Sequence, residues 1–305
     1  MVSRSEDAKR FDLVLVDEFQ DPSVARMALV KSLSNRKGVQ VTVVGDDWQS
    51  INRFAGADLS VMTGFVHVFP QSQTVALTRT FRCDQEICDL SSRFIMRSPS
   101  QQKKIVLGQA RGNSPHLYLR FVDEMDQKRS TANVRQDEIK RIIELEKAHR
   151  PKGKFSVFIL GRYRFELDGL ESPNFGQDID VRIMTIHASK GLEADVVIVV
   201  GMNSGTSYGF PSRINDDPLL GLVMPAPDPF PHSEERRLFY VAATRAKDTL
   251  HFICSQHNPS EFVLEIQRDY EDMIHISGLK ETGLNTCPRC QGILVKRTAR
   301  SSGKE

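Results

Sequence analysis

The sequence predicts an α/β protein built on parallel β-sheets. Short apolar runs that suit strands alternate with segments whose apolar residues recur at helical spacing, an order typical of parallel sheets. The run at residues 196–200 consists of valine and isoleucine, which is characteristic of a strand buried on both faces. A length of 305 residues leaves room for two domains of ordinary size.

The expected elements follow one another from residue 13 to residue 254. We expect strands at residues 13–16, 41–45, 155–160, 181–186, 196–200 and 249–254. We expect helices at residues 24–33, 85–96, 138–148 and 234–246, with residues 80–82 opening the second of them. We expect irregular structure at residues 97–113, which are polar, and at residues 201–231, which are rich in Gly and Pro. The second of these loops is long for a compact domain, and such loops are often functional.

Composition narrows the class of protein. Hydrophobic residues make up 40% of the chain and charged residues 26%, as in a soluble globular protein. No apolar run reaches the roughly 18 residues of a membrane span, and the charged first ten residues do not form a secretory signal. Three of the five cysteines are scattered, which fits a reducing cytoplasm. We therefore expect a cytoplasmic protein without a membrane partner, whose net charge of +2 neither requires nor excludes nucleic acid.

Two acidic turns follow consecutive predicted strands. Asp17 and Glu18 come directly after the first strand, with Gln20 close behind, and Asp46 and Gln49 follow the second. Either turn alone is more simply explained as a solvated loop or a helix cap. Because parallel strands end at the same edge of a sheet, two such turns together favour a site for hydrated Mg²⁺ and a nucleotide phosphate.

Other side chains could contact a polyanion. Phe54 is either a core residue or a stacking platform for an unpaired base, beside the cation Arg53. Arg82 and Arg245 could make ordinary surface ion pairs or reach the oxygens of a transferring phosphoryl group. A further strand runs into His187, after which small and polar residues allow a close approach to phosphates. His187 by itself is more simply explained as a structural histidine.

Five segments occur in a specific order: residues 17–21, 45–58, 80–83, 184–195 and 234–246. In sequence and order they resemble the motifs of the UvrD/Rep-like superfamily 1 DNA helicases, and the resemblance covers residues 11–259. It implies a RecA-like P-loop NTPase fold with parallel sheets. It also implies ATP and Mg²⁺ as cofactors, and movement on single-stranded DNA in the 3′→5′ direction with unwinding of duplex DNA.

The resemblance also assigns roles to individual residues. Asp17 would hold Mg²⁺, Glu18 would activate the hydrolytic water and Gln49 would sense the γ-phosphate. Arg82 and Arg245 would reach that phosphate. The remaining implied contacts are with nucleotide (Gln20, Asp46, Glu193) and with single-stranded DNA (Arg53, Phe54, His187, Ser189, Lys190).

The resemblance divides the chain into three parts. Residues 1–78 would be the C-terminal part of a first motor domain, residues 79–265 a largely complete second motor domain, and residues 266–305 a tail. The phosphate-binding motif G-x-x-x-x-G-K-[ST] does not occur in the sequence. We therefore expect that either a separate chain supplies this motif or the chain is a truncated gene product, and that the chain alone does not hydrolyse ATP. The alternative function is that of a non-catalytic remnant that binds single-stranded DNA or a partner.

The tail contains Cys287 and Cys290, spaced as in half of the zinc ribbon that is appended to bacterial type I topoisomerases. A structural Zn²⁺ site needs four ligands. We expect zinc only if a second pair of ligands completes the site, and an inert or redox-active pair otherwise.

Overall fold

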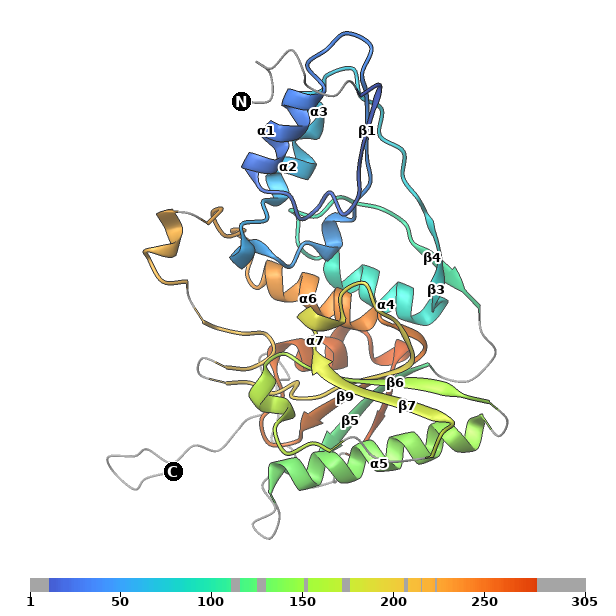
Figure 1. The fold of residues 1–305 in the computed structure, drawn as a ribbon. Coiled ribbons are helices and arrows are strands. Elements are labelled where there is room, and N and C mark those ends of the chain that lie inside the picture. Colours follow the sequence, from blue (N-terminus) through green and yellow to red (C-terminus); the bar gives the residue numbers. More distant parts are fainter. Residues whose placement is uncertain are drawn as a thin grey trace. The chain divides into compact units, whose positions relative to one another are not determined.

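A computed structural model describes residues 11–110, 116–124, 130–150, 153–171, 176–205, 208–214, 216–222 and 224–278 (Figure 1). The chain forms two compact units: one from residues 1–79, 91–106 and 215–241, the other from residues 80–90, 107–214 and 242–305. The domain bounds expected from the resemblance stay a prediction. Within the described residues, no helix combines the length and apolar character that crossing a bilayer requires.

The first unit contains a small parallel β-α-β element. Strands β1 (Leu13–Val16) and β2 (Gln40–Val43) pair in register, and helix α1 (Val24–Leu33) connects them. The helix begins after Ser23, whose side chain accepts a hydrogen bond from the Arg26 backbone N–H at 3.4 Å. The parallel pairing confirms that the two acidic turns leave the sheet at the same edge.

One face of this strand pair is covered by helices. Phe19 is buried against Phe65, with ring centroids 5.4 Å apart and the rings nearly perpendicular. Met27, Val30 and Val61 are buried in the same cluster, to which α1, α2 (Leu59–Thr63) and α3 (Phe65–Val68) contribute. On the opposite face, Leu15 is 69% exposed in the part of the chain that the structure describes.

A second cluster in the first unit holds the turn that follows β2. Trp48 lies in a 3₁₀ turn (Asp47–Gln49) and packs edge-on against Tyr240 of helix α6 (Ser233–Ala243), with centroids 5.2 Å apart. Ile95, at the end of α4 (Gln85–Ile95), completes this cluster. The indole N–H of Trp48 donates to the Gln102 carbonyl at 3.0 Å, so the ring is fixed in position.

The second unit is a six-stranded sheet with helices, and every strand pairing in it is parallel. The strand order is β10-β5-β9-β8-β6-β7. Four of these strands lie where the sequence predicts them, whereas β5 and β10 were not predicted. Their bounds are β5 Leu117–Val122, β6 Phe155–Gly161, β7 Ile179–Thr185, β8 Ala194–Val199, β9 Ala246–Ser255 and β10 His275–Ser277.

Helix α5 (Thr131–His149) crosses one face of this sheet (Figure 1). Its Ile139 and Ile142 are fully buried in one cluster with Val157 and Ile198 of the sheet. Burial of each such side chain contributes about 1.5–3 kcal/mol. This packing holds α5 against the six-stranded sheet.

The prediction that residues 80–82 open a helix was wrong. They lie in strand β3 (Arg79–Asp84), which pairs with β4 (Leu107–Gln109). The helix α4 begins only at Gln85, because Asp84 caps it: its Oδ1 accepts the Glu86 backbone N–H at 2.8 Å. A further helix that was not predicted, α7 (Glu261–Asp269), follows β9.

Candidate functional site

Two accessible carboxylates follow β1. Asp17 and Glu18 are both exposed, and Asp17 Oδ1 accepts the Glu18 backbone N–H at 2.8 Å. Glu18 has a φ angle of +51°, a conformation that residues with a side chain rarely adopt. Strained backbone of this kind is concentrated at functional sites. The turn therefore has the accessibility and the backbone geometry expected of a reactive acidic site.

Gln20 joins the two acidic turns. Its side chain is buried, its Oε1 accepts the Asp46 backbone N–H at 3.0 Å, and its Nε2 donates to Glu18 Oε2. Gly45 permits this approach, because a Cβ at that position would lie 2.8 Å from Gln20 Oε1. The structure thus places the predicted residues Glu18, Gln20 and Asp46 in one hydrogen-bonded group.

Asp46 organises the second turn. Its Oδ2 accepts a hydrogen bond from Gln49 Nε2 at 2.6 Å, and its Oδ1 accepts the Trp48 backbone N–H at 3.1 Å. The predicted phosphate sensor Gln49 is therefore held by the predicted nucleotide-binding carboxylate Asp46.

Lys104 also belongs to this group, although no sequence pattern pointed to it. Its Nζ donates to Asp46 Oδ1 and, at 2.8 Å, to Asp47 Oδ1, and it lies 4.4 Å from the centre of the Trp48 ring. Asp47 is fully buried and also accepts the Gln102 backbone N–H at 2.8 Å. The ammonium group therefore balances part of the negative charge of the acidic turns.

The side chains of Arg53 and Phe54 differ in how accessible they are to a ligand. The Arg53 guanidinium donates to Asp216 at 2.7 Å, to Glu234 at 3.0 Å and to the Pro225 carbonyl at 3.3 Å. All of these acceptors belong to the first unit, so Arg53 is engaged within it. The side chain of Phe54 is 63% exposed, and its ring is accessible for stacking.

In the second unit, the arginines converge on one loop. Arg82 Nε donates to Glu193 Oε2 at 2.9 Å, which brings together two residues that the resemblance places near the nucleotide. Arg245 is fully buried and donates to the Leu192 carbonyl at 3.1 Å. Arg82 and Arg245 therefore meet the same loop, at residues 192–193.

A single 3₁₀ turn (His187–Ser189) follows β7, and Lys190 caps its end. His187 and Lys190 are partly exposed, whereas Ser189 is fully buried and its hydroxyl donates to the Ile186 carbonyl at 2.7 Å. In this structure Ser189 shapes the turn, and the side chains of His187 and Lys190 are accessible. Their predicted contacts with DNA stay a prediction.

An exposed aromatic group in the second unit was also missed. Tyr163 and Phe165 stack with centroids 5.2 Å apart, and Tyr208 meets both rings edge-on. Arg162 lies 4.6 Å from the centre of the Tyr163 ring. The alternation of arginine and aromatic residues at 162–165 is a sequence signal that could have indicated this surface.

The donor chemistry fits Mg²⁺ better than zinc. Asp17 and Glu18 offer hard carboxylate oxygens, and Mg²⁺ is commonly held by one or two carboxylates together with substrate phosphates and water. Among the described residues, no group of three or more His, Cys, Asp or Glu side chains is placed to hold a metal ion. Cys287 and Cys290 lie outside the described residues.

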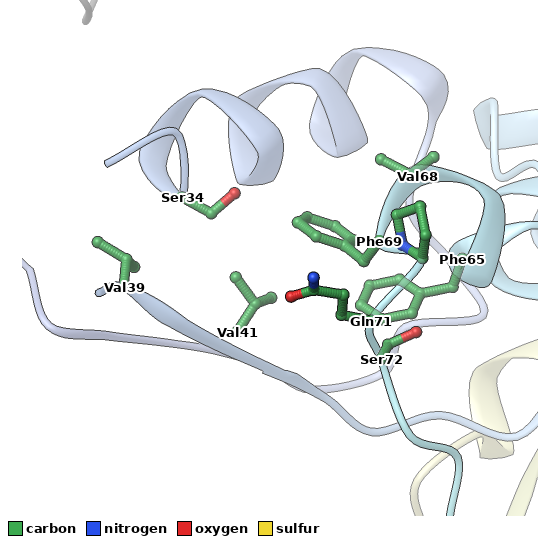
Figure 2. A pocket seen from close by; sticks show the side chains of 9 residues that line it. Ser34, Val39, Val41, Phe65, Val68, Phe69, Gln71 and Ser72 are labelled. Atoms are coloured by element: carbon green, nitrogen blue, oxygen red, sulfur yellow. The ribbon is translucent and has the colours of Figure 1, made fainter. Parts of the chain in front are cut away.

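A pocket of about 430 Å³ lies elsewhere in the first unit, between the end of α1, β2 and α3 (Figure 2). Its lining is mainly apolar and includes Val41, Phe65 and Phe69, with the side-chain amide of Gln71 between Val41 and Phe65. None of the predicted site residues lines it, so the pocket is separate from the acidic turns.

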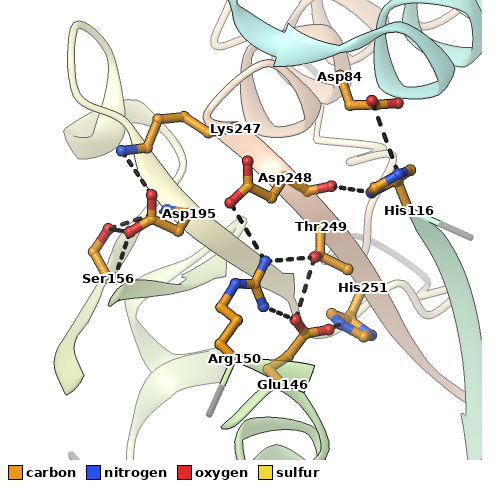
Figure 3. A network of polar contacts seen from close by, with 10 residues as sticks. All are labelled: Asp84, His116, Glu146, Arg150, Ser156, Asp195, Lys247, Asp248, Thr249 and His251. Carbon is orange, nitrogen blue, oxygen red and sulfur yellow. Dashed lines mark hydrogen bonds and ion pairs between the residues drawn. The ribbon is translucent and has the colours of Figure 1, made fainter. Parts of the chain in front are cut away.

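A buried polar network ties α5 to β9 in the second unit (Figure 3). Glu146 accepts hydrogen bonds from Arg150, from Thr249 at 3.3 Å and from His251 Nε2 at 2.9 Å. Arg120 Nε donates to His251 Nδ1 at 3.1 Å, which leaves the proton of a neutral ring on Nε2. Burial lowers the pKa of His251, consistent with a neutral ring.

Burial acts on Glu146 in the opposite direction. Burial alone would raise the pKa of the Glu146 carboxyl, but the contacts with His251 and Arg150 outweigh it and hold that pKa below its usual range. The network therefore contains a carboxylate that stays ionised and a histidine that stays neutral.

The fold and these side chains define a class of protein. Parallel sheets carry acidic turns at a strand edge and arginines on a loop, as in RecA-like nucleotide hydrolases. The family model of the UvrD/REP helicase N-terminal domain matches residues 3–70, and that of the UvrD-like helicase C-terminal domain matches residues 163–257. The chain belongs to the UvrD-like helicases.

Curated relatives agree with this assignment. DNA helicase IV of Escherichia coli (strain K12) is 35% identical over 254 residues, which are 82% of this chain and 35% of that protein. DNA helicase II of the same organism is 32% identical over 126 residues, 41% of this chain and 17% of that protein. The helicase PcrA of Staphylococcus epidermidis is 30% identical over 118 residues, 39% of this chain and 16% of that protein. The chain thus spans about a third or less of the length of these relatives.

Proposed function

We propose that this chain forms the catalytic and translocating part of an ATP-dependent DNA helicase that moves 3′→5′ on single-stranded DNA and unwinds duplex DNA. The observation that carries the proposal is the hydrogen-bonded group in which Gln20 links Glu18 to Asp46, and Asp46 holds Gln49. A module that only binds DNA would not need a general base (Glu18) linked to a phosphate sensor (Gln49). The direction of movement rests on the family resemblance alone.

The residues of this chain would act on ATP in distinct ways. Asp17 would hold Mg²⁺, which neutralises phosphate charge, and Glu18 would accept a proton from the attacking water. Gln49 would hydrogen-bond the terminal phosphate, and Asp46 and Gln20 would keep Gln49 and Glu18 in place. Arg82 and Arg245 would neutralise negative charge that develops during phosphoryl transfer, with Glu193 orienting Arg82 until the nucleotide arrives.

Single-stranded DNA would contact exposed side chains of both units. Phe54 offers a ring for base stacking, and His187 and Lys190 offer polar contacts to the backbone. The aromatic group of Phe165 and Tyr208 is a further accessible surface, since these side chains are 52% and 57% exposed. Arg53 would stabilise the segment that carries Phe54.

The phosphate-binding loop would come from residues other than these 305, in a separate chain or a further segment. We place the protein in the cytoplasm, where a reducing environment suits the buried thiols of Cys83, Cys88 and Cys254. Cys287 and Cys290 would bind Zn²⁺ only with two further ligands.

The second candidate function is a non-catalytic module that binds single-stranded DNA or a protein partner. The absence of the phosphate-binding motif from the sequence favours it. The retained group of Glu18, Gln20 and Gln49 favours the motor, because binding alone would not require it.

Single-stranded DNA-stimulated ATP hydrolysis distinguishes the two functions. We would measure it for the chain alone and for a fusion motor, in which a helicase segment that contains the G-x-x-x-x-G-K-[ST] motif precedes this chain. We expect no measurable turnover by the chain alone and DNA-dependent turnover by the fusion motor. Turnover by the chain alone would contradict the need for an external loop. A fusion motor that binds DNA without hydrolysing ATP would favour the binding module.

A further inference from the structure

We propose that Lys104 is a positioning residue for ATP hydrolysis, acting as the internal counter-ion that holds the Asp46 carboxylate and, through it, Gln49 and Glu18. The inference rests on the proposed function. Lys104 lies 58 residues after Asp46 in the sequence, and both residues belong to the first unit.

The charges around Lys104 require a cation at its position. The side chain of Asp47 is 1% exposed and that of Asp46 is 26% exposed, so two neighbouring carboxylates are largely removed from water. A buried carboxylate without a partner is strongly unfavourable. The Lys104 ammonium donates to both carboxylates, which compensates their burial and their mutual repulsion.

Lys104 is itself held in place. Its side chain is only 21% exposed, and its ammonium group lies 4.4 Å from the centre of the Trp48 ring. Trp48 is fully buried, and its N–H is fixed by the Gln102 carbonyl at 3.0 Å. The backbone N–H of Gln102 in turn donates to Asp47 at 2.8 Å. The cation therefore has a defined position and not that of a mobile surface lysine.

Two hydrogen-bonded routes lead from Asp46 to the reacting groups. On one route, Asp46 Oδ2 accepts a hydrogen bond from Gln49 Nε2 at 2.6 Å. On the other, the Asp46 backbone N–H donates to Gln20 Oε1 at 3.0 Å, and Gln20 Nε2 donates to Glu18 Oε2. Without Lys104, repulsion from Asp47 would displace the Asp46 carboxylate and loosen both routes. Misplacement of a reacting group by about 1 Å can cost about 10²-fold in rate.

The first test uses the chain alone and does not depend on hydrolysis. The variants are Lys104→Met, Lys104→Arg and the matched control Lys103→Met, which removes an exposed charge next to Lys104. Side-chain amide NMR signals of Gln20 and Gln49 report on the two routes, and fluorescence of Trp48, the single tryptophan of the chain, reports on the packing of the turn. We expect Lys104→Met to shift both glutamine signals, while Lys103→Met leaves them unchanged. Unmoved glutamine signals would overturn the inference.

The second test uses the fusion motor. We expect Lys104→Met to lower kcat about 10²-fold with KM for ATP nearly unchanged, and Lys104→Arg to restore most of the loss. In a Gln49→Ala background, Lys104→Met should cost much less than in the wild type, because the two changes affect one route. A purely structural role would give additive losses and would overturn the inference.

The outcomes separate the two proposals. A wild-type fusion motor without ATPase activity contradicts the proposed function. An active wild-type motor whose Lys104→Met variant keeps full kcat contradicts the positioning role alone. If Lys104→Met does not fold, as judged by circular dichroism, Lys104→Gln provides a second neutral variant, for which we expect the same shifts and the same loss of kcat.

Discussion

Arg53 and Glu234 are 181 residues apart in the sequence and form an ion pair, with Arg53 Nε donating to Glu234 Oε2 at 3.0 Å. Asp216 and the Pro225 carbonyl accept the other N–H groups of the same guanidinium at 2.7 and 3.3 Å. Arg53 therefore connects the segment after β2 to α6 and to the residues that precede it, within the first unit.

The first prediction is that Arg53→Met destabilises the chain. The Arg53 side chain is 17% exposed, and charge-assisted hydrogen bonds of this kind contribute about 1.5–3 kcal/mol. We expect a loss of about 1–3 kcal/mol in the free energy of unfolding, measured with urea. The control is Arg182→Met, which breaks an ion pair whose two side chains are 55% and 56% exposed. Equal effects of the two variants would contradict the structural role of Arg53.

The second prediction concerns Phe54. Its exposed ring adds little to stability, so Phe54→Ala should change the free energy of unfolding by less than about 0.5 kcal/mol. The loss of base stacking should weaken binding of a labelled oligothymidylate by about 1–3 kcal/mol, measured by fluorescence anisotropy. Leu222→Ala removes another exposed apolar side chain and should leave the affinity unchanged. If both variants bind DNA like the wild type, Phe54 is not a stacking platform.

The third prediction separates stability from catalysis at Arg82. Its partner Glu193 is 48% exposed, so the pair itself contributes about 0–1 kcal/mol. An arginine that contacts a transferring phosphoryl group contributes about 10³–10⁵ in rate. Arg82→Ala should therefore lower kcat of the fusion motor by at least about 10³-fold and leave its melting temperature nearly unchanged. Arg213→Ala breaks a comparably exposed pair with Glu261 and should retain activity; similar rates for both variants would exclude a catalytic role for Arg82.

The fourth prediction is that Glu18→Gln abolishes hydrolysis by the fusion motor and leaves nucleotide binding intact. An amide cannot accept the proton of the attacking water, but its oxygen can still accept the hydrogen bond from Gln20 Nε2. Binding of a fluorescent ATP analogue and steady-state phosphate release measure the two properties separately. Glu144→Gln, at an exposed position of α5, should behave like the wild type. Continued phosphate release by Glu18→Gln would assign the base to another residue.

The sequence predicts the strands best where apolar residues are continuous. Strand β1 was predicted at residues 13–16, where the structure has it, and β8 within two residues of its start and one of its end. Strand β5 was missed because Tyr118 and Arg120 interrupt its apolar pattern, and only tertiary contacts explain why Arg120 is buried. Helix α5 begins seven residues before the predicted start, since its first turns are polar and lack the apolar periodicity that marked its second half.

Some residues of the candidate site were predictable from local sequence patterns, and others were not. The acidic turns were predictable because each comes directly after a short apolar run that indicates a strand. Lys104 was not predictable, because a single lysine in a polar stretch has no local pattern, and only the fold brings it to Asp46 and Asp47. The pairing of Arg82 with Glu193 likewise depends on the fold, since the residues are 111 positions apart.

The fifth prediction concerns pH and the network of Figure 3. Burial lowers the pKa of His251 in the folded chain, whereas the same histidine in the unfolded chain has an ordinary pKa of about 6.5. Below about pH 6.5 the unfolded chain therefore binds a proton that the folded chain does not. The free energy of unfolding consequently falls as the pH drops below about 6.5. Glu146 acts at lower pH: its folded pKa is depressed, so its contribution is present above the unfolded pKa of about 4.3 and is lost as pH falls further. His251→Gln should remove the first of these two losses, so between pH 7.5 and 5.5 it should lose about 1 kcal/mol less than the wild type in urea unfolding. His149→Gln, at an exposed position, should keep the wild-type dependence. An unchanged dependence in His251→Gln would mean that the His251 ring takes up its proton equally in the folded and unfolded states, which would contradict a lowered pKa.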